Sequence, residues 1–169
     1  MRKSLVFVSI VLALSLVFLM VTPALAANEQ PLTASVTVNE VISITLTDTV
    51  TPGINFGSVS AGVTGQGDVD QNISTPAVKV NVNGETNVNV DIGIKGSTAG
   101  TLALTNWKYS TTFAGAKDPI PATYALVYSA RSPGSSVDFF HWIDVPGGTA
   151  ANTYTCTVYY KAVRTGTAF

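Results

Sequence analysis

Apolar and polar residues alternate with a period of two over many short stretches of this 169-residue chain. One face of the first such stretch carries only apolar side chains: Leu32, Ala34, Val36 and Val38. The other face carries threonine and serine, as expected for a half-buried β-strand. After residue 26 no segment has the 3.6-residue periodicity of an amphipathic helix. The pattern therefore predicts an all-β protein.

Further alternating stretches follow at short intervals, and Gly, Pro, Ser or Asn bounds each of them. They are residues 42–46, 78–82, 88–94, 101–110, 122–130, 136–145 and 153–163. Asn83-Gly84 is a strong turn signal, and it predicts that 78–82 and 88–94 pair as a β-hairpin. Eight or nine short strands with no helix between them predict a single antiparallel β-sandwich.

The first 26 residues have the organisation of a secretory signal peptide. A basic head at Arg2 and Lys3 precedes an apolar run from Leu5 to Val21, and an A-x-A cleavage site ends at Ala26. The run approaches the length of a membrane-spanning helix, so a retained anchor is the alternative. A type IV pilin would need a processing site in front of the run, where only MRKS stands. We expect cleavage after Ala26, secretion, and only transient contact with the membrane during export.

The charge of the chain after residue 26 is low. Cleavage leaves 169 − 26 = 143 residues, with seven basic residues against ten acidic ones, a net charge of about −3. No basic cluster is present to hold phosphates, which argues against a nucleic-acid partner. The polar strand positions are mostly Thr, Ser and Asn, whereas free soluble proteins usually protect sheet edges with charge. This composition favours association between identical subunits.

The residues with potential for catalysis are few. His141 is the single histidine, so an H-E-x-x-H zinc site is excluded and any Ser-His-Asp or Cys-His arrangement depends on this one residue. It lies within the aromatic segment DFFHWID, where we expect a packed strand histidine. Cys156 is the single cysteine and alternates in register with Val158 and Tyr160, which predicts a position on a core face. No catalytic residue is therefore assigned.

A group of aromatic residues in the last two predicted strands allows two interpretations. Their side chains can fill the centre of the sandwich, or they can form a platform for carbohydrate. The residues are Phe139, Phe140, Trp142, Tyr154, Tyr159 and Tyr160.

The segment GDVDQN presents oxygen-bearing side chains at Asp68, Asp70 and Asn72, the spacing that opens calcium-binding loops. Lys79 occupies the place of the later glutamate of an EF-hand, so a calcium site and a plain solvated turn are both open. No other cofactor is expected. Asn72-Ile73-Ser74 is also an acceptor sequon for glycosylation in a secreted chain.

Four segments together resemble archaeal bundling pilins, relatives of the bacterial TasA and camelysin biofilm-matrix proteins. They read LTASVTVNEVISITLTD, INFGSVSAG, NVNVDIGIKG and FFHWIDVPGGTAANTYTCTVYYKAV. The resemblance spans nearly the whole chain after residue 26, although Asn152 and Cys156 stand where glycine is expected. It implies a jelly-roll-like or immunoglobulin-like sandwich and export by the general secretory route. It also implies polymerisation by donor-strand complementation into extracellular filaments at the cell surface, which bundle laterally in cell–cell adhesion and biofilm.

The alternation at the start of the chain and this resemblance agree on a role for the first strand. We expect residues 27–39 to form a donor strand and hinge, residues 40–169 to form the sandwich, and a neighbouring subunit to receive the strand. The donor residues are Leu32, Thr33, Ala34, Ser35, Val36, Thr37 and Val38. The sequence leaves open that this strand folds back into its own sandwich. The rival functions are a monomeric secreted carbohydrate-binding or surface module and a camelysin-like protease, for which the chain has no zinc motif.

Overall fold

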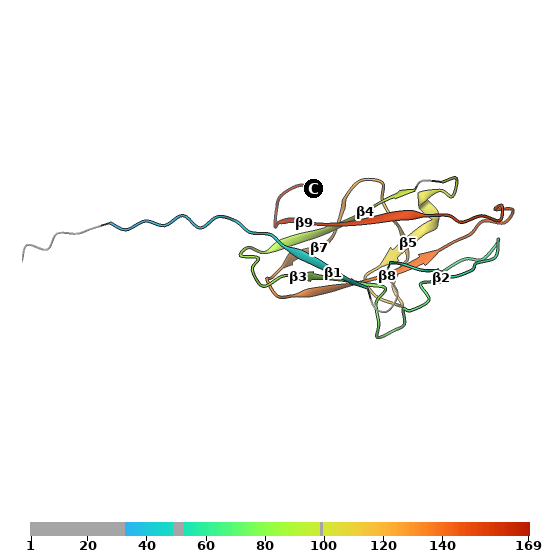
Figure 1. Cartoon of the computed structure of the whole chain (residues 1–169), viewed down its shortest axis with the longest axis horizontal. Coiled ribbons are helices and arrows are strands. Elements are labelled where there is room, and N and C mark those ends of the chain that lie inside the picture. Colours follow the sequence, from blue (N-terminus) through green and yellow to red (C-terminus); the bar gives the residue numbers. More distant parts are fainter. Residues whose placement is uncertain (1–32, 49–52, 99) are drawn as a thin grey trace, which may run out of the picture. The chain divides into compact units, whose positions relative to one another are not determined.

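The computed structural model describes residues 33–48, 53–98 and 100–169 (Figure 1). The expected signal peptide and Leu32 lie outside the described residues. The chain divides into two compact units, Met1–Thr37 and Val38–Phe169. In the first unit, the described residues 33–37 have no regular secondary structure. The second unit contains all the strands that follow.

Two antiparallel sheets make up this second unit. Sheet 1 has the strand order β1-β3-β8-β5-β6, with the short strand β2 paired to the end of β8, and sheet 2 has the order β7-β4-β9. The strands of sheet 1 are β1 (Ile44–Asp48), β2 (Gln66–Gly67), β3 (Val78–Val82), β5 (Trp107–Ser110), β6 (Asp118–Pro119) and β8 (Ser136–Ile143). Those of sheet 2 are β4 (Val90–Thr98), β7 (Ala125–Arg131) and β9 (Cys156–Arg164).

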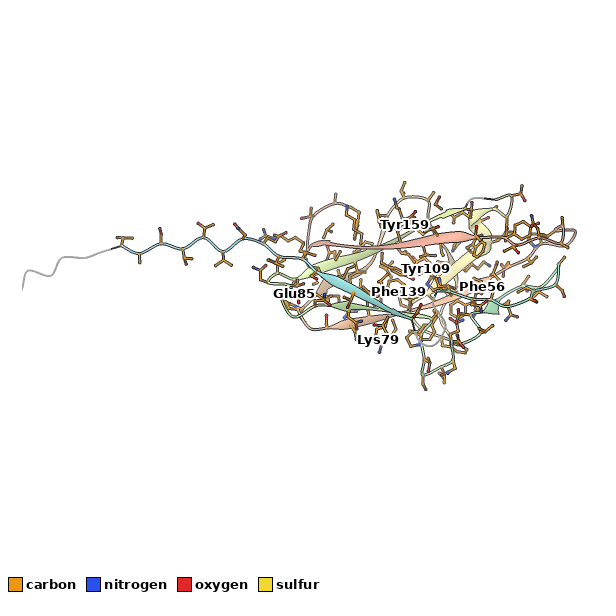
Figure 2. The ribbon with its side chains drawn as sticks, in the orientation of Figure 1. Phe56, Lys79, Glu85, Tyr109, Phe139 and Tyr159 are labelled. Carbon is orange, nitrogen blue, oxygen red and sulfur yellow. The ribbon has the colours of Figure 1, made fainter. Side chains whose placement is uncertain are left out.

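The sheets enclose two hydrophobic clusters. Cluster 1 joins both sheets and contains the buried residues Ala77, Val78, Val80, Val82, Val90, Ile92, Ile94, Val137 and Phe139. Cluster 2 lies at the other end of β8 and contains Leu102, Trp107, Ile120, Ile143 and Val145. Phe139 lies between the sheets, whereas Tyr159 lies on the outer side of sheet 2 (Figure 2). Buried apolar residues of β3, β4 and β8 thus form the centre of the sandwich, and the predicted all-β fold with two antiparallel sheets is confirmed.

The predicted hairpin between 78–82 and 88–94 is wrong. β3 belongs to sheet 1 and β4 to sheet 2, so the chain crosses between the sheets after Asn83-Gly84. The turn itself forms, since the Thr86 N–H donates to the Asn83 carbonyl at 3.1 Å. Beyond the turn the chain bonds instead to the segment before β1, because the Asn87 N–H donates to the Val41 carbonyl at 3.2 Å. The Asn83-Gly84 signal therefore predicted the turn correctly but not which strands pair on either side of it.

Other boundaries differ by a few residues. In the predicted strand 101–110, residues Leu104–Asn106 form a 3₁₀ turn and only Trp107–Ser110 are extended in a ladder. The predicted strand 153–163 begins in the structure at Cys156. The described residues of the first predicted strand, 33–38, belong to neither sheet. Within the described part of the chain, no helix has the length and hydropathy to cross a membrane.

One lateral side of the sandwich is closed by the chain itself. Residues 118–125 pass from β6 in sheet 1 to β7 in sheet 2. On this path the Ile120 N–H donates to the Trp107 carbonyl at 2.8 Å, and the Gly96 N–H donates to the Pro121 carbonyl at 2.8 Å. The crossing therefore bonds to both sheets, and the Ile120 side chain is buried in cluster 2.

Candidate functional site

The opposite lateral side, between β1 and β9, is open. In the described residues β1 pairs only with β3, and β9 pairs only with β4. The outer edges of β1 and β9 therefore present backbone N–H and C=O groups without a strand partner from the described part of the chain. Apolar side chains along these edges are only partly buried against cluster 1: Ile42, Ile44, Val158, Tyr160 and Ala162. Leu46 on β1 is 53% exposed.

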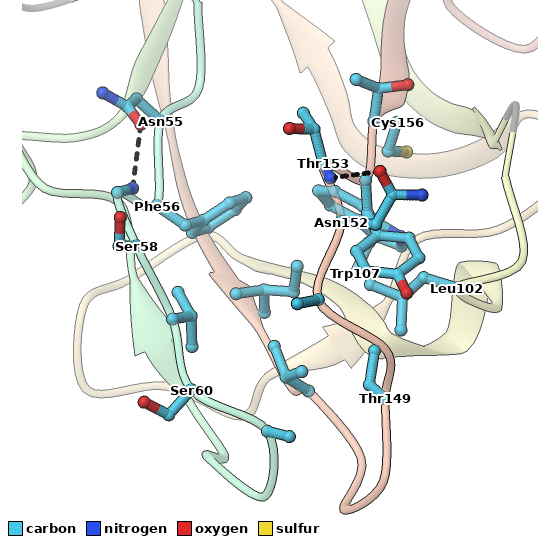
Figure 3. Close-up of a pocket in the computed structure, with 18 of the residues that line it drawn as sticks. Asn55, Phe56, Ser58, Ser60, Leu102, Trp107, Thr149, Asn152, Thr153 and Cys156 are labelled. Carbon is cyan, nitrogen blue, oxygen red and sulfur yellow. Dashed lines mark hydrogen bonds between the residues drawn. The ribbon is translucent and has the colours of Figure 1, made fainter.

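A pocket of about 730 Å³ continues this open side. One wall is the segment 54–61, which follows β1, and the other is the segment 149–156, which leads into β9 (Figure 3). Cluster 2 supplies the floor through Leu102, Trp107, Ile143 and Val145. We call the open side, from β1 and β9 to these two segments, the lateral groove.

The wall 54–61 is held at the edge of sheet 1 by specific bonds. The Asn55 N–H donates to Asp68 Oδ2 at 2.6 Å, and the Val69 N–H donates to the Asn55 carbonyl at 2.8 Å. Just beyond the wall, the Gly62 N–H donates to the Val145 carbonyl at 2.7 Å. From this wall Phe56 projects toward the floor, where its ring meets that of Trp107 edge to face with the ring centres 5.8 Å apart (Figure 3).

Within the described residues, no hydrogen bond joins 54–61 to 149–156. The two walls thus face each other across a space that no described strand fills. Trp107 is 6% exposed, and its indole N–H on the floor of the pocket has no hydrogen-bond partner in the structure. Free edges of β1 and β9 beside a pocket with an apolar floor can accept an extended peptide by strand addition.

The predicted donor residues remain a prediction. Leu32 lies outside the described residues, and residues 33–38 are exposed, with Val36 at 88% and Val38 at 75%. An exposed alternating segment of this kind has apolar side chains that burial against a partner would stabilise.

The three residues of the predicted calcium loop have hydrogen-bonding roles of their own. Asp68 is buried, and its second carboxylate oxygen accepts the Asp70 N–H at 3.0 Å. Asn72 is exposed, and its Oδ1 accepts the Ser74 N–H at 2.8 Å. In the described residues no three His, Cys, Asp or Glu side chains gather as a metal-binding set. Calcium binding, which would also use the Asn72 amide, and glycosylation of Asn72 stay predictions.

His141 is a buried residue that joins the two sheets. Its Nε2 lies 2.7 Å from the Tyr160 hydroxyl, so that β8 is tied to β9 through the core. Burial lowers the pKa of His141 from 6.5 to about 4, so the ring is neutral at pH 7. Burial also raises the pKa of Tyr160. The expectation of a packed strand histidine is confirmed.

Cys156 lines the pocket at the start of β9 and is half-buried against cluster 2. Burial raises the pKa of its thiol, which disfavours the reactive thiolate. The predicted core-facing position is therefore confirmed.

Most of the aromatic group is unavailable as a carbohydrate platform. Phe139, Phe140 and Trp142 are buried, and Tyr160 bonds to His141 in the core. Phe140 and Trp142 lie on the outer face of β8. The centre of the Phe113 ring is 5.8 Å from the ring centre of Phe140 and 6.2 Å from that of Trp142. Tyr159 is 42% exposed, but the Lys95 ammonium already lies 5.0 Å from its ring centre. Core packing is the interpretation that the structure favours for this group.

The few charges of the second unit are unevenly distributed. The strands of sheet 2 carry four basic residues, Lys95, Arg131, Lys161 and Arg164, and one acidic residue, Asp91. The other described residues carry three basic side chains, Lys79, Lys108 and Lys117. Their acidic side chains number eight: Glu40, Asp48, Asp68, Asp70, Glu85, Asp118, Asp138 and Asp144.

Asp91 is buried on sheet 2, and it accepts the N–H groups of Ala130 at 2.9 Å and Gly166 at 3.0 Å. These hydrogen bonds lower its pKa, so the carboxylate keeps its charge while fixing both neighbouring strands.

Comparison of the chain with protein-family models, with curated proteins and with solved structures gave no match. The fold and the lateral groove are thus the evidence on which a function can be based. Sequence reasoning missed the wall 54–61, because Ile54, Phe56 and Val59 are separated by Gly and Ser and do not form a regular strand pattern. Their apolar side chains within a polar segment were the available signal.

Proposed function

We propose that this protein is the structural subunit of an extracellular filament, polymerised by donor-strand complementation. The alternating segment 32–38 of one subunit enters the lateral groove of a neighbour and completes its jelly-roll-like sandwich. The observation that carries the proposal is the open side of the sandwich: β1 and β9 each have an unpaired edge, and the adjoining pocket between segments 54–61 and 149–156 has an apolar floor.

The donor segment 32–38 and the lateral groove have complementary chemistry. An added strand satisfies backbone groups on the free edges, at roughly 1 kcal/mol for each hydrogen bond. Its apolar face meets the partly buried side chains of Val158, Tyr160 and Ile44. The threonine and serine on its other face remain compatible with solvent. A strand inserted in this way is a main-chain interaction that tolerates a loose sequence pattern, since specificity comes only from alternate side chains.

The test begins with the mature chain from Ala27, imaged by negative-stain electron microscopy. We expect long fibres from this chain and single particles from a variant that lacks residues 27–38. A synthetic peptide of residues 32–38 should bind the truncated variant and raise its melting temperature, because a ligand of the native state stabilises it. Fibres from the truncated variant would show that segment 27–38 is not the donor.

A single substitution provides the matched test. Val36→Asp places a carboxylate on the apolar face of the donor strand, where burial in the groove would leave it unpaired. It should abolish fibres and leave the melting temperature of the monomer unchanged, since Val36 is 88% exposed. Thr37→Asp, on the polar face, is the control and should still polymerise.

A further inference from the structure

The backbone between Asn39 and Ser43 is attached to the domain by side chains as well as by two backbone hydrogen bonds, from the Asn87 N–H to the Val41 carbonyl and from the Asn83 N–H to the Ser43 carbonyl. Asn87 makes the key contacts: the Val41 N–H donates to Asn87 Oδ1 at 2.9 Å, and Asn87 Nδ2 donates to the Asn39 carbonyl at 2.8 Å. The Asn87 N–H also donates to the Val41 carbonyl at 3.2 Å. One residue thus satisfies three backbone groups in a three-residue stretch.

Thr86 binds the same stretch in a similar way at Ser43, two residues after Val41. It is 2% exposed, and its hydroxyl accepts the Ser43 N–H at 3.0 Å and donates to the Ser43 carbonyl at 3.0 Å. Ser43 then leads directly into β1. The side chains of Thr86 and Asn87 therefore add to the two backbone hydrogen bonds of this stretch, which belongs to no strand.

A second element holds the same stretch from β9. Glu40 lies between the two residues that Asn87 binds, and its carboxylate is 3.6 Å from Arg164 Nη1. The pair is exposed, so its contribution to stability is small, but it attaches the stretch to sheet 2 as well as to the crossing before β4. The stretch 39–43, which follows the expected donor strand and hinge, is thus bonded to the domain on two sides.

We propose that Asn87 is a positioning residue, which fixes the root of the N-terminal segment so that this segment bends only before Asn39. The inference rests on the proposed function, and it adds where each joint between subunits is rigid. A donor strand that leaves from a fixed root transmits the orientation of one subunit to the next. A root that is free over residues 39–43 would add five rotatable residues to every joint of the filament.

The requirement is specific to asparagine. Its amide carries a donor and an acceptor at the spacing of a peptide group, which is what the Val41 N–H and the Asn39 carbonyl need. Aspartate keeps the acceptor but replaces the donor by a second anionic oxygen, which would face the Asn39 carbonyl.

The experiment compares Asn87→Ala with Asn89→Ala. Asn89 is also an exposed asparagine of this crossing. Its backbone carbonyl accepts the Thr165 N–H at 2.9 Å. In the full-length monomer, hydrogen exchange at the Val41 amide should accelerate by up to roughly tenfold in Asn87→Ala and stay unchanged in Asn89→Ala. In filaments, measured by electron cryomicroscopy, the persistence length should fall roughly twofold in Asn87→Ala alone, since the joint gains flexible residues.

The outcomes separate the two claims. Equal persistence lengths in wild type and Asn87→Ala would overturn the positioning role, even where exchange at Val41 is faster. Absence of filaments from the wild type would instead refute the proposed function, and unchanged exchange at Val41 would refute the anchoring itself. If Asn87→Ala does not fold, Arg164→Gln removes only the Glu40 contact, and it should shorten the persistence length in the same direction by less; no change there also counts against the proposal.

Discussion

The two lateral sides of the sandwich differ in whether the chain itself covers the edge strands of the two sheets. On the side of β5, β6 and β7, residues 118–125 cross from one sheet to the other and bond to Trp107 in sheet 1 and Gly96 in sheet 2. On the side of β1 and β9, no described strand joins the two edges, and the adjoining pocket between segments 54–61 and 149–156 has an apolar floor. The closed side is satisfied by the chain itself, whereas the open side has a free edge on each sheet.

The closed side therefore contributes to the stability of the domain, whereas the open side keeps backbone groups that can bind another strand. A free edge beside a hydrophobic floor is a liability for a monomer, because it promotes association. The same arrangement is an asset for a subunit whose association is its function. The predictions below contrast the two sides, and they proceed from the largest expected effect to the smallest.

The closed side should be the more sensitive to truncation of a side chain. Ile120→Ala removes a buried group of cluster 2 from the crossing, and we expect the free energy of unfolding to fall by about 2–5 kcal/mol. Leu46→Ala on the open side should cost less than about 1 kcal/mol, because Leu46 is 53% exposed in the monomer. Denaturation by urea of both monomeric variants measures the difference. Equal losses would contradict the distinction between the sides.

Acid should weaken the tie between sheet 1 and the open-side strand β9. The pKa of His141 is about 4 in the folded protein, against 6.5 as the ordinary value, so between these values the unfolded chain binds more protons. Stability is therefore full above pH 6.5 and falls as the pH drops toward 4, by roughly 3 kcal/mol in total at 1.36 kcal/mol per pH unit.

The measurement is the free energy of unfolding at a series of pH values, with His141→Gln as the variant that cannot titrate. Between pH 6.5 and 5 the wild type should lose stability and the variant should not. Parallel curves for the two proteins would show that another group is responsible.

Cys156 provides a native reporter of the lateral groove. Its thiol lines the pocket, and its raised pKa predicts slow alkylation by a maleimide at pH 7 and faster alkylation at pH 9. The peptide of residues 32–38 should slow this reaction in the chain that lacks residues 27–38, because it covers the pocket. Mass spectrometry follows the modified fraction. An unchanged rate with saturating peptide would place the peptide elsewhere.

Substitutions on the outer face of β1 should have the smallest effect on the stability of the monomer. Thr45 donates to Asn83 Oδ1 at 3.0 Å, and Thr47 accepts from Asn81 Nδ2 at 3.0 Å, so this face carries neutral polar groups bonded to one another. Thr45→Lys with Thr47→Lys should lower monomer stability by no more than about 1 kcal/mol. If this face mediates lateral contacts, the variant should form separate filaments where the wild type forms bundles.

Salt gives the corresponding control. Contacts between neutral polar groups should persist from 50 mM to 500 mM salt, whereas contacts between opposite charges weaken as the Debye length falls from roughly 14 Å to 4 Å. Light scattering of wild-type filaments across this range distinguishes them. Bundles that dissolve in moderate salt would indicate ionic contacts, which the basic strands of sheet 2 and the acidic remainder of the described chain could supply.

Alternation predicted the longer strands of both sheets but not their partners, and it missed the two-residue strands β2 and β6. Val78, Val80 and Val82 must face a core in any sheet, so the strand was predictable from the sequence alone. Its neighbours depend on where the Asn83-Gly84 turn directs the chain, and this is decided by Asn87, Thr86 and the distant Val41 and Ser43. Contacts between residues more than 40 positions apart leave no local pattern.

The candidate site was predictable in part for the same reason. The alternating segment 32–38 could be proposed as a donor from its own residues. The pocket of the lateral groove could not be predicted, because its walls are two irregular segments, 54–61 and 149–156, that meet only through the fold. The bonds that fix the first of them come from Asp68, which the sequence suggested as a calcium ligand.

The strands of sheet 2 and the rest of the described chain carry opposite net charges, and this arrangement gives the domain an electric dipole. Sheet 2 carries a net charge of +3 on its strands (four basic against one acidic), and the other described residues carry −5 (three basic against eight acidic). In a helical polymer the components perpendicular to the axis point in successive directions and cancel over a turn. In a filament of the proposed kind only the axial component of this dipole would accumulate, so the fibre would present little transverse field beyond a Debye length and would have distinct electrical ends.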